Sequence, residues 1–410
     1  MTKPRTTEPE RSQGVIRFEM PVDALEPEHP ARVLWHVLGT LELGAFLSAA
    51  KSLDGHAGRP THSPQMLLTL WTYAISRGIG SAREIERLVS TDRSFGWIVG
   101  DVAVSHHVLS RFRIGHRAAL DALMTDILGA LVHKGVLSLR LVALDGMRVR
   151  AAASAPSFRR DASLLECREQ AALHLKAVLA EADDPELSRA QRAARERGAR
   201  DFQDRVEAAI STVRELQEDR KPSASPARAS TTDAEARVMK MGDGGFRPAM
   251  NVRTATAGSE LGGPRTVVAV DVTNVGSDMG ALTPMLAQIE ARTGELPGTV
   301  LADANHANHE AIAAAAKAGV QTLISVPART RASGPNGNTA IAEWKARMET
   351  DEAKRLYRAR AGLCEWTNAQ LAGRFGLRQF LVRGIEKTSC VALLYAITSN
   401  LTQHLTTLAG

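Results

Sequence analysis

The sequence predicts an α/β fold whose strand-rich core is preceded by an all-α region and interrupted by a long helical segment. Residues 18–136 carry apolar side chains at helical spacing throughout. Residues 157–229 are rich in Arg, Glu, Ala, Gln and Leu and poor in β-branched and aromatic residues, which is typical of exposed helices. The rest of the chain alternates strand and helix patterns, and this alternation predicts an α/β core.

The chain begins with a polar, charged segment, residues 1–17, whose composition predicts disorder. Within residues 18–136, Ser63 is followed by a proline and an apolar series at helical spacing, which predicts the start of a helix. A glycine-containing break precedes Ser81, and Glu84 three residues later completes a capping box for the next helix. Short helices joined by tight turns are therefore expected.

Such a helical region suits two roles. Helices joined by glycine-containing turns are what a helix-turn-helix DNA reader needs, and the basic residues Arg111 and Arg113 would then contact DNA. Small bundles that serve as scaffolds or dimerisation units show the same pattern. Both interpretations remain open for residues 18–136.

Strand character begins in residues 137–156. Apolar residues lead up to Asp145, Gly146 follows, and alternation then resumes, which predicts a hairpin of two short strands around a glycine turn. Residues 157–229 predict a charged, coiled-coil-like helical hairpin that ends in a flexible link at 221–226. Its thin apolar seam favours a solvated hairpin over a subunit or DNA clamp.

The last region, residues 230–410, continues the α/β pattern. Strands are expected near 246–256, 265–273, 299–302 and 320–326, and helices near 279–292, 308–318 and 344–408. Asp303 ends one apolar run and Asp271 ends another, so the pattern alone does not separate them; Glu365 lies in a predicted helix. Buried strands often deliver a catalytic Asp at their carboxyl end, and two Asp with a helical Glu can hold divalent metal ions for phosphoryl transfer.

Composition narrows the class of protein. The formal charge is +6, and much of the positive charge is Arg, the residue suited to phosphate recognition. The cysteines Cys167, Cys364 and Cys390 lack CxxC spacing, so neither a disulfide framework nor a zinc site is expected, and a reducing compartment fits. The N-terminus has no apolar signal-peptide core and no apolar stretch could span a bilayer. A cytoplasmic protein without a membrane partner is therefore expected.

Several stretches resemble the DDE transposases of bacterial insertion sequences. They follow one another in the order seen in that family and together extend over about residues 20–400. These stretches are 63–68, 78–86, 142–146, 148–154, 230–237, 244–248, 271–274, 276–278, 365–370 and 376–380. Matching order over most of the chain is more specific than any one motif.

The resemblance implies a fold and a domain division. The family has an RNase H-like (retroviral integrase-like) catalytic core, and here it would comprise residues 137–156 and 230–410. Residues 157–229 would be its helical insertion and linker, and residues 18–136 its all-α N-terminal transposase and DNA-binding domain. The implied function is that of an insertion-sequence DNA transposase, which binds terminal inverted repeats and performs metal-dependent strand cleavage and strand transfer.

The resemblance also implies the catalytic residues. Asp145, Asp303 and Glu365 match the DDE triad and would bind Mg²⁺, with Mn²⁺ able to substitute. Tyr357 and Arg360 match the Tyr and Arg that precede the Glu in many relatives and help to bind DNA phosphate there. Asp303 is followed by an alanine, where many relatives have a glycine.

Further DNA contacts are expected around the triad. Arg374 is the nearest candidate for the basic residue that follows the Glu by about two turns, and Arg148 and Arg378 lie in matching stretches. By analogy, the protein would act as a homodimer on paired transposon ends and target DNA, associated with the nucleoid. A metal-dependent DNA nuclease and a domesticated DNA-binding protein without catalysis remain alternatives.

Overall fold

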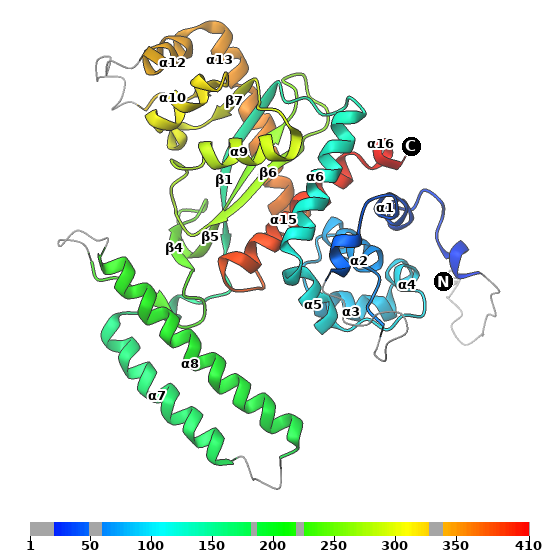
Figure 1. Cartoon of the computed structure of the whole chain (residues 1–410), viewed down its shortest axis with the longest axis vertical. Coiled ribbons are helices and arrows are strands. Elements are labelled where there is room, and N and C mark those ends of the chain that lie inside the picture. The colour runs from blue at the N-terminus through cyan, green and yellow to red at the C-terminus, as the bar shows by residue number, and fades with distance from the viewer. Residues whose placement is uncertain (1–19, 49–59, 182–186, 219–224, 328–338, 410) are drawn as a thin grey trace, which may run out of the picture.

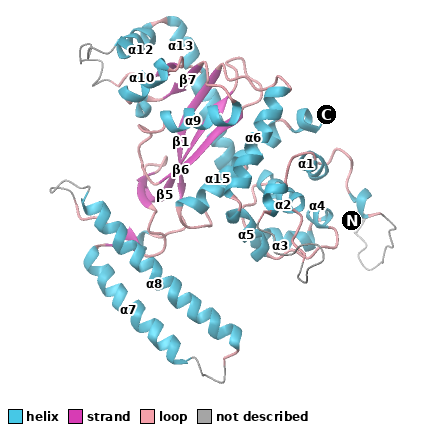
Figure 2. Ribbon diagram, in the orientation of Figure 1, coloured by secondary structure: helices cyan, strands magenta, loops and turns pink. Residues whose placement is uncertain are grey.

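The computed structural model describes residues 20–48, 60–181, 187–218, 225–327 and 339–409. The segment 1–17, expected to be disordered, and residues 221–224 of the expected link lie outside the described residues. The described chain is mixed α/β, as the sequence predicts. Helices lie at its N-terminal end, a sheet is surrounded by further helices, and a helical hairpin projects away from the sheet (Figure 1, Figure 2).

The N-terminal region is helical, as its spacing predicts. Its elements are η1 (Pro21–Ala24), α1 (Pro30–Gly39), η2 (Gly44–Leu47), α2 (Pro64–Ser76), α3 (Ala82–Thr91), α4 (Arg93–Val99), α5 (His106–Gly115) and α6 (Arg117–His133). The Ser63 hydroxyl accepts a hydrogen bond from the Met66 amide at 3.4 Å and begins α2. Ser81 begins α3 in the same way through the Glu84 amide. Both predicted helix starts are confirmed. They could be predicted because capping depends on the local sequence.

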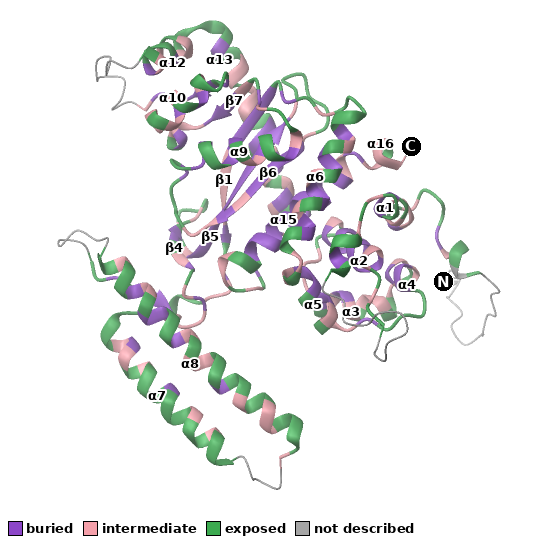
Figure 3. Ribbon diagram, viewed as in Figure 1, coloured by how far each residue is buried: buried purple, intermediate pink, exposed green. Residues whose placement is uncertain are grey.

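The N-terminal helices share a hydrophobic core with the sheet. Helix α15 (Ile385–Gln403) packs against α2, α5 and α6 as well as against the sheet strand β6 (Thr266–Thr273). Every residue from Thr388 to Leu401 is buried, as expected for a helix enclosed on all sides. In Figure 3 most of α15 is drawn as buried. Residues 18–136 are therefore joined to the rest by packing, not only by the chain.

The sheet combines antiparallel and parallel pairing. Strand β1 pairs antiparallel with β5, and β5 pairs antiparallel with β4 and β6. On its other side β1 pairs parallel with β7, which pairs parallel with β8. The remaining strand bounds are β1 (Leu141–Arg150), β4 (Arg237–Lys240), β5 (Phe246–Ala257), β7 (Thr299–Ala302) and β8 (Gln321–Ile324).

The prediction of a hairpin in residues 137–156 is wrong. Strand β1 runs without a turn through Gly146, whose partner on β5 is Arg253. A side chain at position 146 would collide with the carboxylate of Asp278, since an added Cβ would lie 2.5 Å from Asp278 Oδ1. The glycine is therefore required by the close approach of this side chain and not by a turn.

The remaining helices surround the sheet and continue to the C-terminus. They are α9 (Leu282–Thr293), η5 (Ala304–His306), α10 (His309–Lys317), α12 (Thr339–Glu349), α13 (Asp351–Tyr357), η6 (Ala361–Glu365), α14 (Trp366–Ala369), η7 (Gln370–Arg374) and α16 (Leu405–Ala409). Elements η6 and η7 are π-helical turns on either side of α14. Such turns are rare and are frequent at functional sites.

The expected helical hairpin is present as α7 (Asp161–Ala180) and α8 (Arg189–Glu218), flanked by the short paired strands β2 (Phe158–Arg159) and β3 (Ala229–Ser230). Its apolar contacts gather near the base, around Leu164, Val206 and Ile210. Farther along, Leu173 is 68% exposed, and most of the hairpin surface is exposed in Figure 3. Within the described residues, no helix has the length and hydropathy to cross a membrane.

Candidate active site

Asp145 and Asp303 lie on neighbouring parallel strands. In the register of β1 and β7, Leu141 faces Thr299 and Ala143 faces Leu301. Extending this register by two residues places Asp145 beside Asp303, which directly follows β7. The charge of Asp303 accordingly acts on Asp145 and favours its protonated form.

Asp145 is a partly buried carboxylate that accepts a hydrogen bond from a side-chain amide. Asn368 Nδ2 donates to Asp145 Oδ2 at 3.0 Å, and Asn368 Oδ1 accepts from the Thr254 hydroxyl at 3.2 Å. Burial raises the pKa of Asp145, and the charge of Asp303 raises it further against the opposing charge of Arg360. The sequence did not indicate Asn368, although it lies three residues after Glu365 within the matching stretch 365–370.

Asp303 is fixed by residues that immediately follow it. Its carboxylate accepts from the Asn305 backbone amide at 3.0 Å and from Asn305 Nδ2 at 2.9 Å, and Oδ1 lies 2.9 Å from His306 Nδ1. Burial alone would raise the pKa of Asp303, but the contacts with His306 and Asn305 outweigh burial and lower it. His306 is 1% exposed. The sequence signal that could have indicated this partner is the i,i+3 spacing of Asp303 and His306.

Glu365 lies at the end of the π-helical turn η6 and is bound by Arg360. Arg360 Nη2 donates to Glu365 Oε1 at 2.6 Å, and the Glu365 side chain is 53% exposed. The Arg360 guanidinium also lies 6.0 Å from the centre of the Tyr357 ring. Beneath them, Leu363 packs against residues of β1, β7 and β8, which holds η6 over the same strands that carry the two Asp.

Arg360 connects the three carboxylates electrostatically. Burial disfavours its charge, but the charges of its neighbours, Asp145 and Glu365 among them, raise its pKa overall. The positive charge of Arg360 in turn favours the ionised forms of Asp145 and Asp303. A guanidinium therefore lies among all three members of the expected triad.

The donor chemistry fits a hard divalent cation, because carboxylate oxygens are the ligands such ions prefer. Asp145 and Asp303 also fit by position, since their strands are adjacent and their negative charges repel without a cation. Glu365 is instead engaged by Arg360. Within the described ranges, no three His, Cys, Asp or Glu side chains are gathered closely enough to hold a metal ion.

Two family models match the chain. Residues 20–114 match a transposase domain (DUF772), and residues 328–405 match a transposase DDE domain. Both are models of transposase domains, and together they support an insertion-sequence DDE transposase. No curated protein and no solved structure matches it.

The second match includes Tyr357, Arg360 and Glu365, whereas Asp145 and Asp303 lie outside both matched segments. The assignment of the two Asp as triad members of this transposase therefore depends on their geometry.

The alternative carboxylate, Asp271, lies elsewhere in the transposase sheet. It is on β6, which is separated from β1 by β5, and its carboxylate is 3.8 Å from Arg253. Strand β7, in contrast, is hydrogen-bonded directly to β1. Asp303 is thus the strand-end Asp that the fold brings to Asp145.

Arg113 cannot be the DNA contact that the sequence predicts. It is 7% exposed, donates to the Gly80 carbonyl at 2.8 Å and lies 4.9 Å from the centre of the Trp71 ring. Its guanidinium connects helices inside the bundle and is not available to a phosphate. Arg111, on the same helix, is exposed.

The arginines expected near the triad differ in their exposure and in the groups that they contact. Arg148 is half-buried and lies 3.3 Å from Asp278, so it anchors a loop of the protein itself. Arg374 and Arg378 are exposed. Arg374 lies 5.4 Å from the centre of the Phe375 ring, and Arg378 donates through Nε to the Ala372 carbonyl at 3.0 Å.

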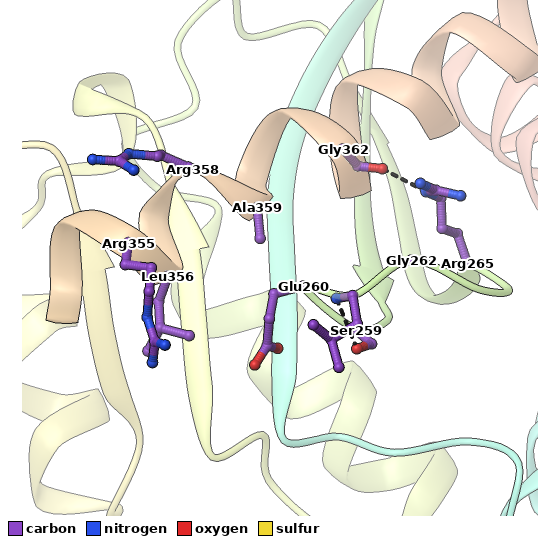
Figure 4. A pocket seen from close by; sticks show the side chains of 10 residues that line it. Ser259, Glu260, Gly262, Arg265, Arg355, Leu356, Arg358, Ala359 and Gly362 are labelled. Carbon is purple, nitrogen blue, oxygen red and sulfur yellow. Dashed lines mark hydrogen bonds between the residues drawn. The ribbon is translucent and has the colours of Figure 1, made fainter.

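A basic cavity of about 560 Å³ lies between α13, η6 and the loop that joins β5 to β6 (Figure 4). Arg265 donates to the Gly362 carbonyl at this cavity and stacks over the Trp366 ring at 4.5 Å. Arg355 and Arg358 also line it. One face of Trp366 is therefore occupied by an arginine of the transposase.

Proposed function

We propose that this transposase binds the terminal inverted repeats of its insertion sequence and cleaves and joins DNA strands through Asp145, Asp303 and Glu365. The observation that carries the proposal is the adjacency of β1 and β7, which brings Asp145 and Asp303 together beneath the helical turn that bears Glu365. Three carboxylates from two neighbouring strands and one covering helix are suited to metal-dependent phosphoryl transfer.

We further propose that the sheet is an RNase H-like core. Its order, β6-β5-β1-β7-β8 with antiparallel pairing on one side of β1 and parallel pairing on the other, supports this. The core would comprise residues 137–156 and 230–410, with 157–229 as its helical insertion and 18–136 as the N-terminal DNA-binding domain. The packing of α15 against both parts favours a fixed orientation between them.

Asp145 and Asp303 would hold the divalent cation, Mg²⁺ or Mn²⁺, and Glu365 would complete the donor set. Bound there, the cation would supply Lewis-acid stabilisation of the charge on the scissile phosphate. Asn368 fixes the orientation of the Asp145 carboxylate through its hydrogen bond, and His306 does so for Asp303. Such supporting contacts determine how well carboxylates serve as ligands.

The remaining chemistry requires charge compensation. A water molecule, or later the freed 3′-hydroxyl of the transposon end, would form a bond to phosphorus while the bond from phosphorus to the leaving 3′-oxygen breaks. No covalent bond to the protein is needed. Arg360 places a positive charge among the carboxylates and would offset the repulsion between them and the DNA phosphate. Tyr357, beside Arg360, would contact the same phosphate.

The test compares Asp145→Asn with Asp271→Asn in the full chain. Both substitutions remove one carboxylate at nearly constant volume, but only Asp145 lies beside Asp303. With a substrate that carries the inverted repeats flanking the gene and with Mg²⁺, we expect Asp145→Asn to lose strand cleavage and Asp271→Asn to retain it. Equal loss in both variants, or cleavage by Asp145→Asn, would contradict the assignment.

Strand transfer separates the alternatives. A transposase joins a pre-cut end to target DNA, a nuclease of the same fold only cuts, and a domesticated DNA-binding protein does neither. Binding of paired ends by a homodimer is part of the proposal, and the mass of the complex with two end fragments tests it.

A further inference from the structure

A second basic cavity, of about 480 Å³, lies next to Asp145 on the side toward the end of β1. Met147, which lines it, is two residues after Asp145 on the same face of the strand, a separation of about 7 Å. Asn368 also lines it and donates to the Asp145 carboxylate. The cavity therefore borders the carboxylate site through Asn368. We call it the arginine pocket.

Arginine dominates the charge of the arginine pocket. Arg148, Arg150, Arg247 and Arg378 line it, together with one acidic residue, Asp243. Two of these charges are already compensated, because Arg247 lies 2.6 Å from Asp243 and Arg148 is paired with Asp278 outside the pocket.

Arg150 and Arg378 remain available. Both are exposed, and neither has an ion-pair partner in the part of the chain that the structure describes. Exposed guanidiniums without carboxylate partners are suited to phosphate groups, which they bind through paired hydrogen bonds.

The arginine pocket also has apolar lining residues. Met147, Met241 and Leu377 line it. Thioether side chains adapt to flat aromatic surfaces and make favourable sulfur–aromatic contacts. A volume of about 480 Å³ is in the range of pockets for single small molecules. Arginines without ion-pair partners and methionines that line one cavity of this size match one nucleotide, which offers a phosphate to the former and a base to the latter.

We propose that the arginine pocket binds one unstacked nucleotide of the DNA strand adjacent to the scissile phosphate. Arg150 and Arg378 contact its phosphates, and Met147 and Met241 contact its base. Unstacking the base costs a few kcal/mol, and the new contacts offset that cost. This inference rests on the proposed function for the identity of the strand, but it concerns binding and not cleavage.

Disulfide cross-linking tests the position of the base. In a Cys167→Ala background, where the remaining cysteines Cys364 and Cys390 are buried, Met241→Cys is compared with Val238→Cys. Val238 lies on β4, which ends directly before Met241. It is 51% exposed and does not line the pocket. With single-stranded oligothymidylate carrying one thiol-tethered base, we expect Met241→Cys to cross-link and Val238→Cys not to do so. Equal cross-linking of the two variants would overturn the proposal.

Salt dependence tests the phosphate contacts. Arg150→Gln/Arg378→Gln is compared with Arg197→Gln/Arg214→Gln, which removes two exposed charges from α8. Binding of fluorescent oligothymidylate is measured in EDTA between low and moderate salt. Losing two phosphate contacts should reduce the slope of log K against log salt by about 1.4. A slope equal to that of the α8 control refutes the phosphate contacts.

Failure of this inference and failure of the proposed function give different results. If the arginine pocket does not bind DNA but Asp145→Asn still abolishes cleavage, only the pocket proposal falls. If cross-linking at position 241 occurs while cleavage does not depend on Asp145, the pocket stands and the catalytic assignment falls.

Discussion

The substitution Gly146→Ala should destabilise the protein although it adds only one methyl group. Gly146 lies within β1, and its backbone is not in the left-handed region, so backbone strain does not enter. The added Cβ would lie 2.5 Å from Asp278 Oδ1 and 2.8 Å from Asn251 Oδ1. Asn251 Nδ2 donates to Asp278 Oδ1, so the two side chains are held together in a buried network and neither can move away without straining or breaking that hydrogen bond.

The expected loss in the free energy of unfolding can be estimated from the contacts of Asp278. Asp278 is 3% exposed and accepts from Asn251 Nδ2 at 2.6 Å, from Arg253 Nε at 3.4 Å and from Arg148 Nη1 at 3.3 Å. Overpacking a filled site costs about 1–3 kcal/mol. Loss of a hydrogen bond to a charged group adds about 1.5–3 kcal/mol. We therefore expect Gly146→Ala to lower the free energy of unfolding by about 2.5–6 kcal/mol.

Gly129→Ala is the matched control. Gly129 lies inside α6, and an added Cβ would meet nothing within 4 Å. Since Ala favours a helix over Gly by about 0.8–1 kcal/mol, this variant should be slightly more stable than the parent. Urea unfolding of the two variants should thus shift the midpoint in opposite directions. A midpoint for Gly146→Ala within error of the parent would refute the close-contact argument.

Three further outcomes are expected. Arg113→Ala should lower the free energy of unfolding by about 2–4 kcal/mol because it removes a buried charge-assisted hydrogen bond; Arg111→Ala should leave urea unfolding unchanged. Burial lowers the pKa of His404 below 6.5, so the unfolded chain binds a proton that the folded state excludes. The free energy of unfolding should therefore fall as the pH drops below about 6.5, and fall less in His404→Gln. Asn368→Ala, which frees Asp145, should slow single-turnover cleavage about 10–100-fold.

Features that depend on local sequence were predicted most completely. The starts of α2 and α3 follow from Ser63 and Ser81, whose side chains cap amides three residues away. The helical hairpin follows from composition alone. Gly146 was misassigned because its role depends on Asp278, which is far away in the sequence. Arg113 was misassigned for a similar reason, since its burial depends on how α2 and α5 pack.

In the candidate site, too, local motifs could be predicted and tertiary contacts could not. Asp145 and Glu365 were proposed from motifs, but Asn368 reaches Asp145 only through a tertiary contact. His306 contacts Asp303 across an i,i+3 spacing that is common in turns and helices of every kind. The bond between Arg360 and Glu365 was not expected either. Residue types in a sequence indicate which chemistry is available, whereas hydrogen-bond partners depend on which elements pack together.

The preference for Asp303 over Asp271 has a structural origin several residues upstream. Strand β7 is buried on both faces, so its apolar residues do not specify which way Asp303 points. The register is instead set where β7 begins. The Gly298 amide donates to the Leu139 carbonyl at 3.0 Å, and an added Cβ on Gly298 would lie only 3.3 Å from the Arg140 carbonyl oxygen. A glycine at this position lets β7 approach β1 in the register that carries Asp303 to Asp145.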